Sequence, residues 1–135
     1  MSAKTRPSDG KQTETESPLF NRYASSYADV VDEAVSFSGQ DSAFFIKAKI
    51  GLLKDLITAH LGPIQGVRLL DVGCGTGNLH AGLIAEGSQI TGVDVADGLL
   101  ETARAKNRSV QYELFDGCNL PFHSGSFDLS IAVCV

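Results

Sequence analysis

The chain has 135 residues, a formal net charge of −5, a pI of about 5.0 and a hydrophobic fraction of 43%, which suits one domain with a buried core. The acidic balance argues against a general nucleic-acid or anionic-membrane surface, because both need clustered Lys and Arg. The three cysteines form no CxxC pair, which disfavours a zinc site or a disulfide framework, and neither a signal peptide nor an apolar run of about 20 residues is visible. We therefore expect a cytoplasmic protein.

The N-terminal half of the chain predicts a tail followed by helices. Residues 1–18 are polar and rich in Ser, Thr, Lys and Glu, which predicts a disordered tail. From residue 19 apolar side chains recur at helical spacing, and a second helix is expected from residue 41 or 42 up to the stop signal Gly62-Pro63. Its expected packed face comprises Phe45, Ala48, Leu52, Leu53, Leu56 and Ile57.

From residue 67 the pattern alternates between short apolar runs and amphipathic stretches. Strands are expected at 67–72, 88–95, 109–116 and 127–135, and helices at 76–87 and 96–107. Strands that alternate with helices are typical of an α/β sheet with right-handed crossovers. In such a sheet, ligands bind beyond the carboxyl ends of the strands.

The stretch "LLDVGCGTG", residues 69–77, follows the first of these strands. Glycines there let the backbone adopt positive φ and approach a ligand closely. The dinucleotide fingerprint G-x-G-x-x-G fails because its sixth position is Asn78, and no P-loop lysine follows. What remains, D-x-G-x-G-x-G, resembles motif I of class I S-adenosylmethionine-dependent methyltransferases. The resemblance implies cofactor contacts along the loop from Asp71, Gly73, Cys74, Gly75 and Gly77. The Cys74 thiol is expected to pack rather than to act as a nucleophile.

Two further segments are similar to the same family. Asp94 closes the second strand, 21 positions after Gly73, where a carboxylate can accept hydrogen bonds from both hydroxyls of a ribose. Val95 is the next residue of this block and joins the expected cofactor site. The alternative for Asp94 is a turn or helix-capping role.

The third segment, "FDGCNLPFHSGSFDLSIAVCV", looks like the family's "D-A-x-x-L-P-F-x-x-x-S-F-D" block. The resemblance implies that Asp116 meets the adenine amino group and that Gly117, where the family often has Ala, offers a backbone contact beside the ring. The alternative for Asp116 is a loop residue that caps nearby amides. A looser likeness in "FNRYASSYADVV" implies that Tyr23 and Tyr27 lie near the cofactor mouth, although packing on a helix face is an equal alternative.

We interpret the chain as a class I methyltransferase that uses S-adenosylmethionine on an unidentified small-molecule acceptor, cut short after the fourth strand. The expected fold is a Rossmann-like three-layer sandwich with a parallel sheet in the order 3-2-1-4. It divides into a tail (1–18), an N-terminal helical lid (19–66) and an incomplete cofactor-binding domain (67–135). The apolar fourth strand would form an open edge, which favours self-association.

No residue stands out as a catalytic base, and His80 and His123 look isolated, so no metal is assigned. The alternatives are a non-catalytic cofactor-binding module or fragment and, less favoured, an NAD(P)-dependent oxidoreductase.

Overall fold

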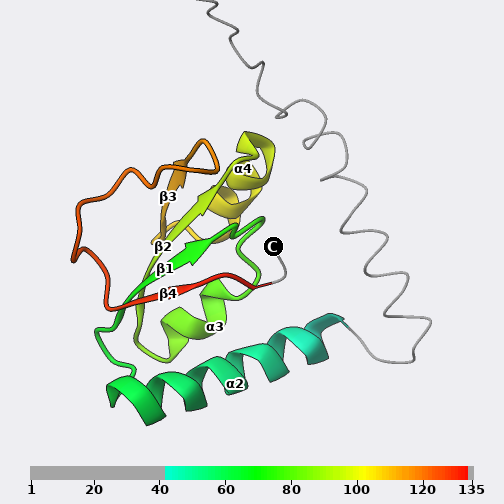
Figure 1. Cartoon of the computed structure of the whole chain (residues 1–135). Coiled ribbons are helices and arrows are strands. Elements are labelled where there is room, and N and C mark those ends of the chain that lie inside the picture. The colour runs from blue at the N-terminus through cyan, green and yellow to red at the C-terminus, as the bar shows by residue number, and fades with distance from the viewer. Residues whose placement is uncertain (1–41, 134–135) are drawn as a thin grey trace, which may run out of the picture.

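The computed structural model describes residues 42–133 (Figure 1). The elements in this range are α2 (Ser42–Leu61), β1 (Arg68–Val72), α3 (His80–Ala85), β2 (Gln89–Asp94), α4 (Asp97–Lys106), β3 (Gln111–Leu114) and β4 (Leu129–Ile131). The expected tail, the expected first helix and both Tyr23 and Tyr27 lie outside the described residues. No helix within residues 42–133 is long and apolar enough to cross a bilayer.

The four strands form one parallel sheet in the order β3-β2-β1-β4 (Figure 1). This confirms the predicted fold class and strand order. β1 is the central strand from which the chain winds to β2 and β3 on one side and returns to β4 on the other. The carboxyl ends of β1 and β2 therefore meet beside the point where the strand order reverses, which is where open α/β sheets bind ligands.

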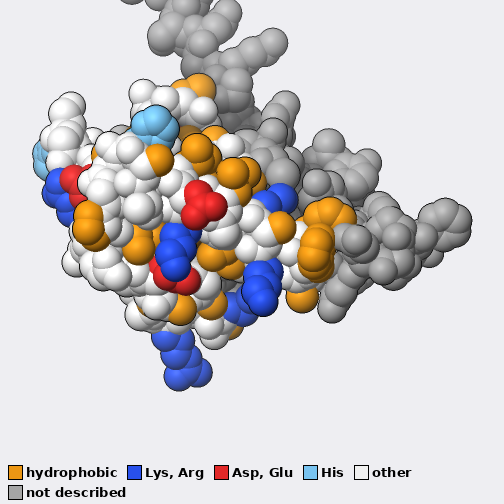
Figure 2. Space-filling model, turned by 90° about the horizontal axis from the view of Figure 1, so that it is seen from below, with side chains coloured by type: hydrophobic (Ala, Val, Ile, Leu, Met, Phe, Trp, Pro, Cys, Tyr) orange, Lys and Arg blue, Asp and Glu red, His pale blue; other side chains and the backbone are white. Residues whose placement is uncertain are grey.

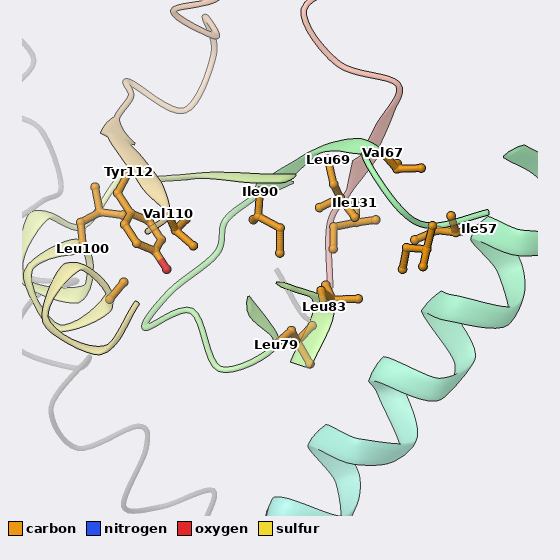
Figure 3. Close-up of a cluster of buried hydrophobic side chains, with 12 residues drawn as sticks. Ile57, Val67, Leu69, Leu79, Leu83, Ile90, Leu100, Val110, Tyr112 and Ile131 are labelled. Atoms are coloured by element: carbon orange, nitrogen blue, oxygen red, sulfur yellow. The ribbon is translucent and has the colours of Figure 1, made fainter. Parts of the chain in front are cut away.

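The hydrophobic core lies between the sheet and the two crossover helices (Figure 3). Its members include Leu69, Ile90, Tyr112 and Ile131 from the strands, Leu79 and Leu83 from the α3 region, and Leu100 and Ala103 from α4. Strand side chains alternate between faces, and the register aligns Leu69 with Ile90, Gly92 with Tyr112 and Asp71 with Ile131. The strand members thus share one face, which α3 and α4 cover.

The packed face of α2 differs from the predicted one. Ile57 is buried, and Ile46, Ile50 and Leu53 pack against the core, one turn apart along the helix. Leu53 and Ile57 were therefore predicted correctly, whereas the other residues expected on that face are exposed, namely Phe45, Ala48, Leu52 and Leu56. Phe44 is exposed as well, and hydrophobic side chains reach the surface on the side of the molecule where α2 lies (Figure 2). The contact between α2 and α3 sets which face of α2 turns toward the core, because the Ile50 side chain fills the space beside Gly82 of α3.

All six strands and helices predicted from residue 67 onward are shorter than expected, α3 and β4 by the most. α3 begins at His80 rather than near Thr76, because Gly77 has φ +71° and a left-handed residue cannot continue a right-handed helix. β4 covers Leu129–Ile131, so the described Ala132 and Val133 are not part of the strand.

The start of β4 is fastened to the start of β1 by an ion pair. Asp128 Oδ2 accepts hydrogen bonds from the Arg68 backbone N (2.9 Å) and Nε (3.2 Å), and Oδ1 accepts from Nη2 (3.0 Å). These contacts lower the pKa of the Asp128 carboxyl, chiefly through the hydrogen bonds from Arg68. Asp128 is therefore a structural residue at the amino end of the sheet.

Candidate functional site

The loop between β1 and α3 lies at the carboxyl end of the sheet. Gly73, Gly75 and Gly77 have φ of +72°, +56° and +71°, values that side chains other than glycine rarely adopt. The backbone N–H groups of Gly73 and Cys74 both donate to the Val93 carbonyl, at 2.8 and 3.0 Å. The loop is thereby fastened to the end of β2.

Gly75 and Gly77 differ in the space that a side chain would find at each position. A Cβ built on Gly75 would meet no atom of residues 42–133 within 4 Å, so among these residues nothing blocks a ligand from this side of the loop. A Cβ on Gly77 would lie 2.6 Å from Tyr112 Oη and 2.9 Å from both Asn107 Nδ2 and His80 Nδ1. Gly77 is thus required by the packing beneath the loop, a role that the sequence motif did not reveal.

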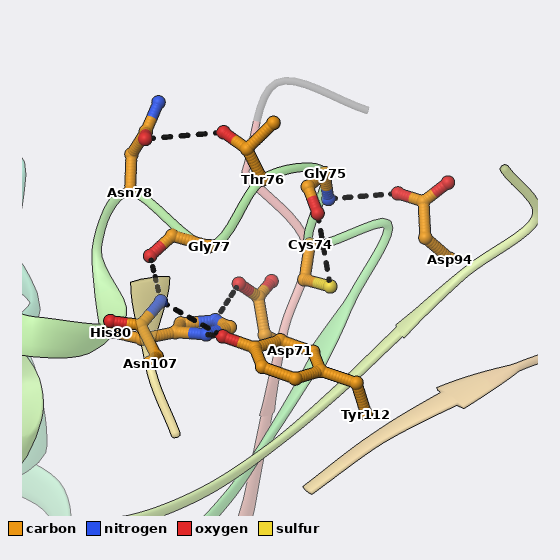
Figure 4. Close-up of polar contacts among 10 residues, drawn as sticks. All are labelled: Asp71, Cys74, Gly75, Thr76, Gly77, Asn78, His80, Asp94, Asn107 and Tyr112. Atoms are coloured by element: carbon orange, nitrogen blue, oxygen red, sulfur yellow. Dashed lines mark hydrogen bonds and ion pairs between the residues drawn. The ribbon is translucent and has the colours of Figure 1, made fainter. Parts of the chain in front are cut away.

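Asp94 faces this loop from the end of β2 (Figure 4). Its side chain is buried, Oδ2 accepts a hydrogen bond from the Gly75 backbone N at 2.8 Å, and Oδ1 accepts from the Ala96 backbone N at 2.9 Å. Each carboxylate oxygen has two lone pairs, so both oxygens keep capacity for a further donor. The structure therefore brings the Asp94 carboxylate to the Gly75 amide of the glycine loop.

The segment after β3 runs close to the segment after β2. A Cβ on Gly117, where φ is +87°, would lie 3.4 Å from Val95 Cγ1. Val95 is exposed beside it. An apolar side chain and a bare backbone therefore lie next to each other beyond the ends of β2 and β3.

Asp116 itself caps the turn that follows it. Oδ1 accepts from the backbone N of Cys118 (2.8 Å) and of Asn119 (2.6 Å), and Oδ2 accepts from Asn119 Nδ2 (2.8 Å). The side chain and then the backbone N–H of Asn119, followed by the Cys118 amide, lower the pKa of the Asp116 carboxyl to about 2. The carboxylate is exposed and charged at neutral pH. Its contacts among residues 42–133 are those of a residue that caps nearby amides, which was the alternative interpretation of Asp116.

Beneath the loop lies a cluster of buried polar side chains that the sequence analysis missed (Figure 4). His80 Nε2 is 2.8 Å from Asp71 Oδ2, and His80 Nδ1 is 2.6 Å from Tyr112 Oη. Asn107 Nδ2 donates to Tyr112 Oη at 3.0 Å and to the Gly77 carbonyl at 3.1 Å. The sequence suggested that His80 is isolated, but the structure places it inside this cluster. Asp71 joins the cluster from the end of β1, directly below the loop.

The Cys74 side chain packs under the loop, as expected. A Cβ on Gly92 would lie 2.8 Å from Cys74 Sγ, so β2 passes close to the sulfur. Burial, with smaller contributions from the charges of Asp71 and Asp94, raises the pKa of the Cys74 thiol to about 12. Cys118, by contrast, is free and exposed.

These two cysteines are expected to differ in reactivity. Because the thiolate is the reacting form, a raised pKa and burial together should make Cys74 at least about tenfold slower than Cys118 toward iodoacetamide at pH 8. Time-resolved peptide mass mapping of the folded protein measures both rates. In urea the rates should converge, and equal rates in the folded protein would contradict the partly buried position of Cys74.

A separate hollow of about 610 Å³ opens at the other end of the sheet. Its lining includes Arg68, Gln89 and Gln111, which are the first residues of β1, β2 and β3, together with Phe122 and Phe127. It therefore lies at the amino ends of the strands, away from the glycine loop. Among residues 42–133 no three His, Cys, Asp or Glu side chains gather as metal ligands would.

A parallel sheet, a glycine loop at its switch point and a buried acid at the end of β2 define a Rossmann-like nucleotide-cofactor domain. Residues 70–135 match the family model of a methyltransferase domain. Over 74 residues the chain is 36% identical to demethylmenaquinone methyltransferase of Clavibacter sepedonicus, covering 53% of this chain and 30% of that protein. Over 60 residues it is 37% identical to a ubiquinone biosynthesis O-methyltransferase of Alkalilimnicola ehrlichii, covering 44% and 24%.

Solved structures agree on the fold. CalS10, an amino pentose methyltransferase from Micromonospora echinaspora solved with S-adenosylmethionine bound, matches with a TM-score of 0.61 and 25% identity over 76% of this chain and 41% of that chain. A TehB-like methyltransferase from Corynebacterium glutamicum has a TM-score of 0.59 at 21% identity, over 83% and 55%. In residues 70–135, just under half of its length, this chain matches the class I S-adenosylmethionine-dependent methyltransferases in fold, glycine loop and sequence. It spans less than a third of the length of the two curated relatives named above.

Proposed function

We propose that this chain binds S-adenosylmethionine at the glycine loop, as the cofactor-binding part of an enzyme that methylates a small molecule. The observation that carries the proposal is the pairing of Asp94 with Gly75. Asp94 anchors the Gly75 amide at 2.8 Å, while the other side of Gly75 is open space. A ligand with hydroxyl donors can thus meet a fixed carboxylate and a backbone with no side chain in the way.

The remaining site residues fit parts of the same cofactor. Asp94 is suited to the ribose hydroxyls, and Val95 and Gly117 offer an apolar side chain and a bare backbone to the faces of the adenine. Asp116 is a charged acceptor at the same end of the sheet. The loop residues Asp71, Gly73, Cys74, Gly75 and Gly77 would hold the methionine portion, with Asp71 acting from below through His80.

When bound, S-adenosylmethionine supplies a methyl group already activated on a sulfonium. The chain's own contribution is to orient the cofactor and exclude water, which is most of what such a displacement needs. We assign no catalytic base among residues 42–133. The two curated relatives are named for quinone methylation and CalS10 for an amino pentose, which supports a small-molecule acceptor.

The proposal also covers the N-terminal part of the chain, the edge of the sheet and the cellular setting. Residues 19–66, of which α2 is the described part, would act as a lid over residues 67–135. β4 is the outer strand of the described sheet, which supports self-association along its edge. Cys74 and Cys118 are both free thiols, as a cytoplasmic setting would allow.

The test is calorimetric titration of S-adenosylmethionine into the protein and into Asp94→Ala. The variant loses acceptors for the ribose and also the anchor of the Gly75 amide, so binding should weaken at least about tenfold. Circular dichroism confirms that both proteins are folded. Asp97→Ala is the matched control, because Asp97 lies three residues further along, is exposed, and pairs with Arg104 at 3.6 Å.

The control should bind within about twofold of the parent, since an exposed ion pair contributes little. Equal binding by Asp94→Ala would remove Asp94 from the site. A folded parent that binds NADH but not S-adenosylmethionine would favour the oxidoreductase alternative and overturn the proposal.

A further inference from the structure

Four side chains form a continuous hydrogen-bonded network beneath the glycine loop (Figure 4). It runs from Asn107 through Tyr112 and His80 to Asp71, and each of these residues is less than a tenth exposed. The four come from the end of α4, from β3, from the start of α3 and from β1. The network therefore connects β1, α3, α4 and β3 beneath the loop.

The hydrogen-bond partners of each group show where the protons of this network lie. Asn107 Nδ2 lies 3.1 Å from the Gly77 carbonyl, which only accepts, so the amide group must present its NH₂ there and to Tyr112 Oη. Tyr112 Oη accepts from Asn107 and has one proton of its own to donate. Burial raises the pKa of the Tyr112 hydroxyl to about 12, so that proton stays in place and is available to His80 Nδ1, 2.6 Å away.

His80 then has one consistent form. Its Nδ1 accepts from Tyr112, and its Nε2 carries the proton and donates to Asp71 Oδ2 at 2.8 Å. With both ring nitrogens protonated, Tyr112 Oη would face two donors and its own proton would lack a partner among these four residues, which is costly in a buried site. The network is fully satisfied when His80 is neutral with its proton on Nε2.

This network is attached to both ends of the loop. Asp71 lies two residues before Gly73 in the chain. At the other end, the Gly77 carbonyl accepts from Asn107 Nδ2 and from the His80 backbone N, both at 3.1 Å. The His80 ring is stacked on Tyr112, with centroids 5.5 Å apart and an interplanar angle of 22°. None of these contacts uses the open side of Gly75.

We propose that His80 is a positioning residue of the cofactor loop: as a neutral imidazole protonated on Nε2, it orients the Asp71 carboxylate directly and supports the Gly77 peptide through Tyr112 and Asn107, so that the loop is shaped before the cofactor arrives. The proposal rests on the proposed function for its effect on S-adenosylmethionine, but its effect on the loop does not need a ligand. A preorganised loop avoids the ordering cost of binding.

The experiment compares His80→Leu with His80→Gln. Leucine fills the space but leaves Asp71 without its donor, whereas the glutamine amide can donate to Asp71 and accept from Tyr112. We expect His80→Leu to speed hydrogen exchange at the Gly75 and Gly77 amides and to weaken S-adenosylmethionine binding, each by about tenfold or more. His80→Gln should restore both to within about threefold of the parent.

Two controls separate positioning from general loss of stability. Ile90→Val, a core change near the amino end of β2, should lower stability but leave loop exchange and binding unchanged. Long-range ¹H–¹⁵N spectra of the parent should show His80 protonated on Nε2 only, a readout that remains decisive if His80→Leu does not fold. A proton on Nδ1, or a folded His80→Leu with unaltered loop exchange, would overturn the inference.

The outcome also distinguishes this inference from the proposed function. If the parent binds S-adenosylmethionine and His80→Leu binds equally well, the inference fails while the proposed function stands. If the parent does not bind it and loop exchange still responds to His80→Leu and recovers in His80→Gln, the positioning role stands and the cofactor assignment fails.

Discussion

Replacing Gly77 by alanine is expected to lower the free energy of unfolding by about 3 kcal/mol. Two effects add. Gly77 has φ +71°, and a side chain in that conformation costs about 1 kcal/mol or more. The new Cβ would also lie 2.6–2.9 Å from atoms of Tyr112, Asn107 and His80, so buried hydrogen bonds must break or lengthen, at about 1–3 kcal/mol for a polar group left unpaired.

Gly75→Ala is the matched control for this measurement. Gly75 also has positive φ, +56°, but a Cβ there meets nothing within 4 Å. Only the backbone term applies, and we expect a loss of about 1 kcal/mol. Urea denaturation followed by circular dichroism, with linear extrapolation, gives both values. Equal losses for the two variants would show that the space beneath Gly77 is less restricted than the structure indicates.

The sheet was predictable from the sequence because its signals are local. Each strand is a short apolar run, such as "RLLDV" in β1, and the helices between them oblige the strands to run parallel. The position of Asp94 followed from the same logic, since the last residue of β2 must lie at the carboxyl end of the sheet. Its hydrogen bond to the Gly75 amide was not predicted, because the sequence indicated only that Asp94 and the glycine loop lie at the same end of the sheet.

The buried network beneath the loop was not predictable in this way. His80 is nine residues from Asp71 and 32 from Tyr112, so no periodic pattern links them. A tyrosine in a strand and an asparagine at a helix end each have ordinary local explanations. Tyr112 lies under the loop because the register of β3 against β2 aligns it with Gly92. The sequence pattern gave no sign that the missing side chain of Gly77 leaves room for the Tyr112 hydroxyl.

The face of α2 was mispredicted for a different reason. Its apolar residues are distributed around the helix, so helical periodicity does not select one stripe. Phe44, Phe45, Leu52 and Leu56 are all exposed, while Ile46, Ile50, Leu53 and Ile57 face the core. The choice between these stripes is made by α3, which has a glycine, Gly82, where Ile50 approaches. That is tertiary information which the sequence of α2 does not contain.

The corrected face leads to a second large expected effect, tested at two adjacent positions of α2. Ile57 is 2% exposed and Leu56 is 48% exposed, although the sequence pattern placed both on the packed face. Ile57→Ala should lower the free energy of unfolding by about 3 kcal/mol, because it removes buried methyl groups and leaves a cavity. Leu56→Ala should cost less than about 1 kcal/mol, since its side chain is already half in water.

Alanine is a good helix former, so neither change destabilises α2 itself, and the difference between the two variants reports packing alone. The same urea experiment measures both. A larger loss at Leu56 than at Ile57 would mean that α2 is rotated on α3, with Leu56 rather than Ile57 facing the core. In that case Ile50 would also leave Gly82, and an alanine at Gly82 would become tolerable, which provides an independent check on the orientation of α2 against the cofactor-binding sheet.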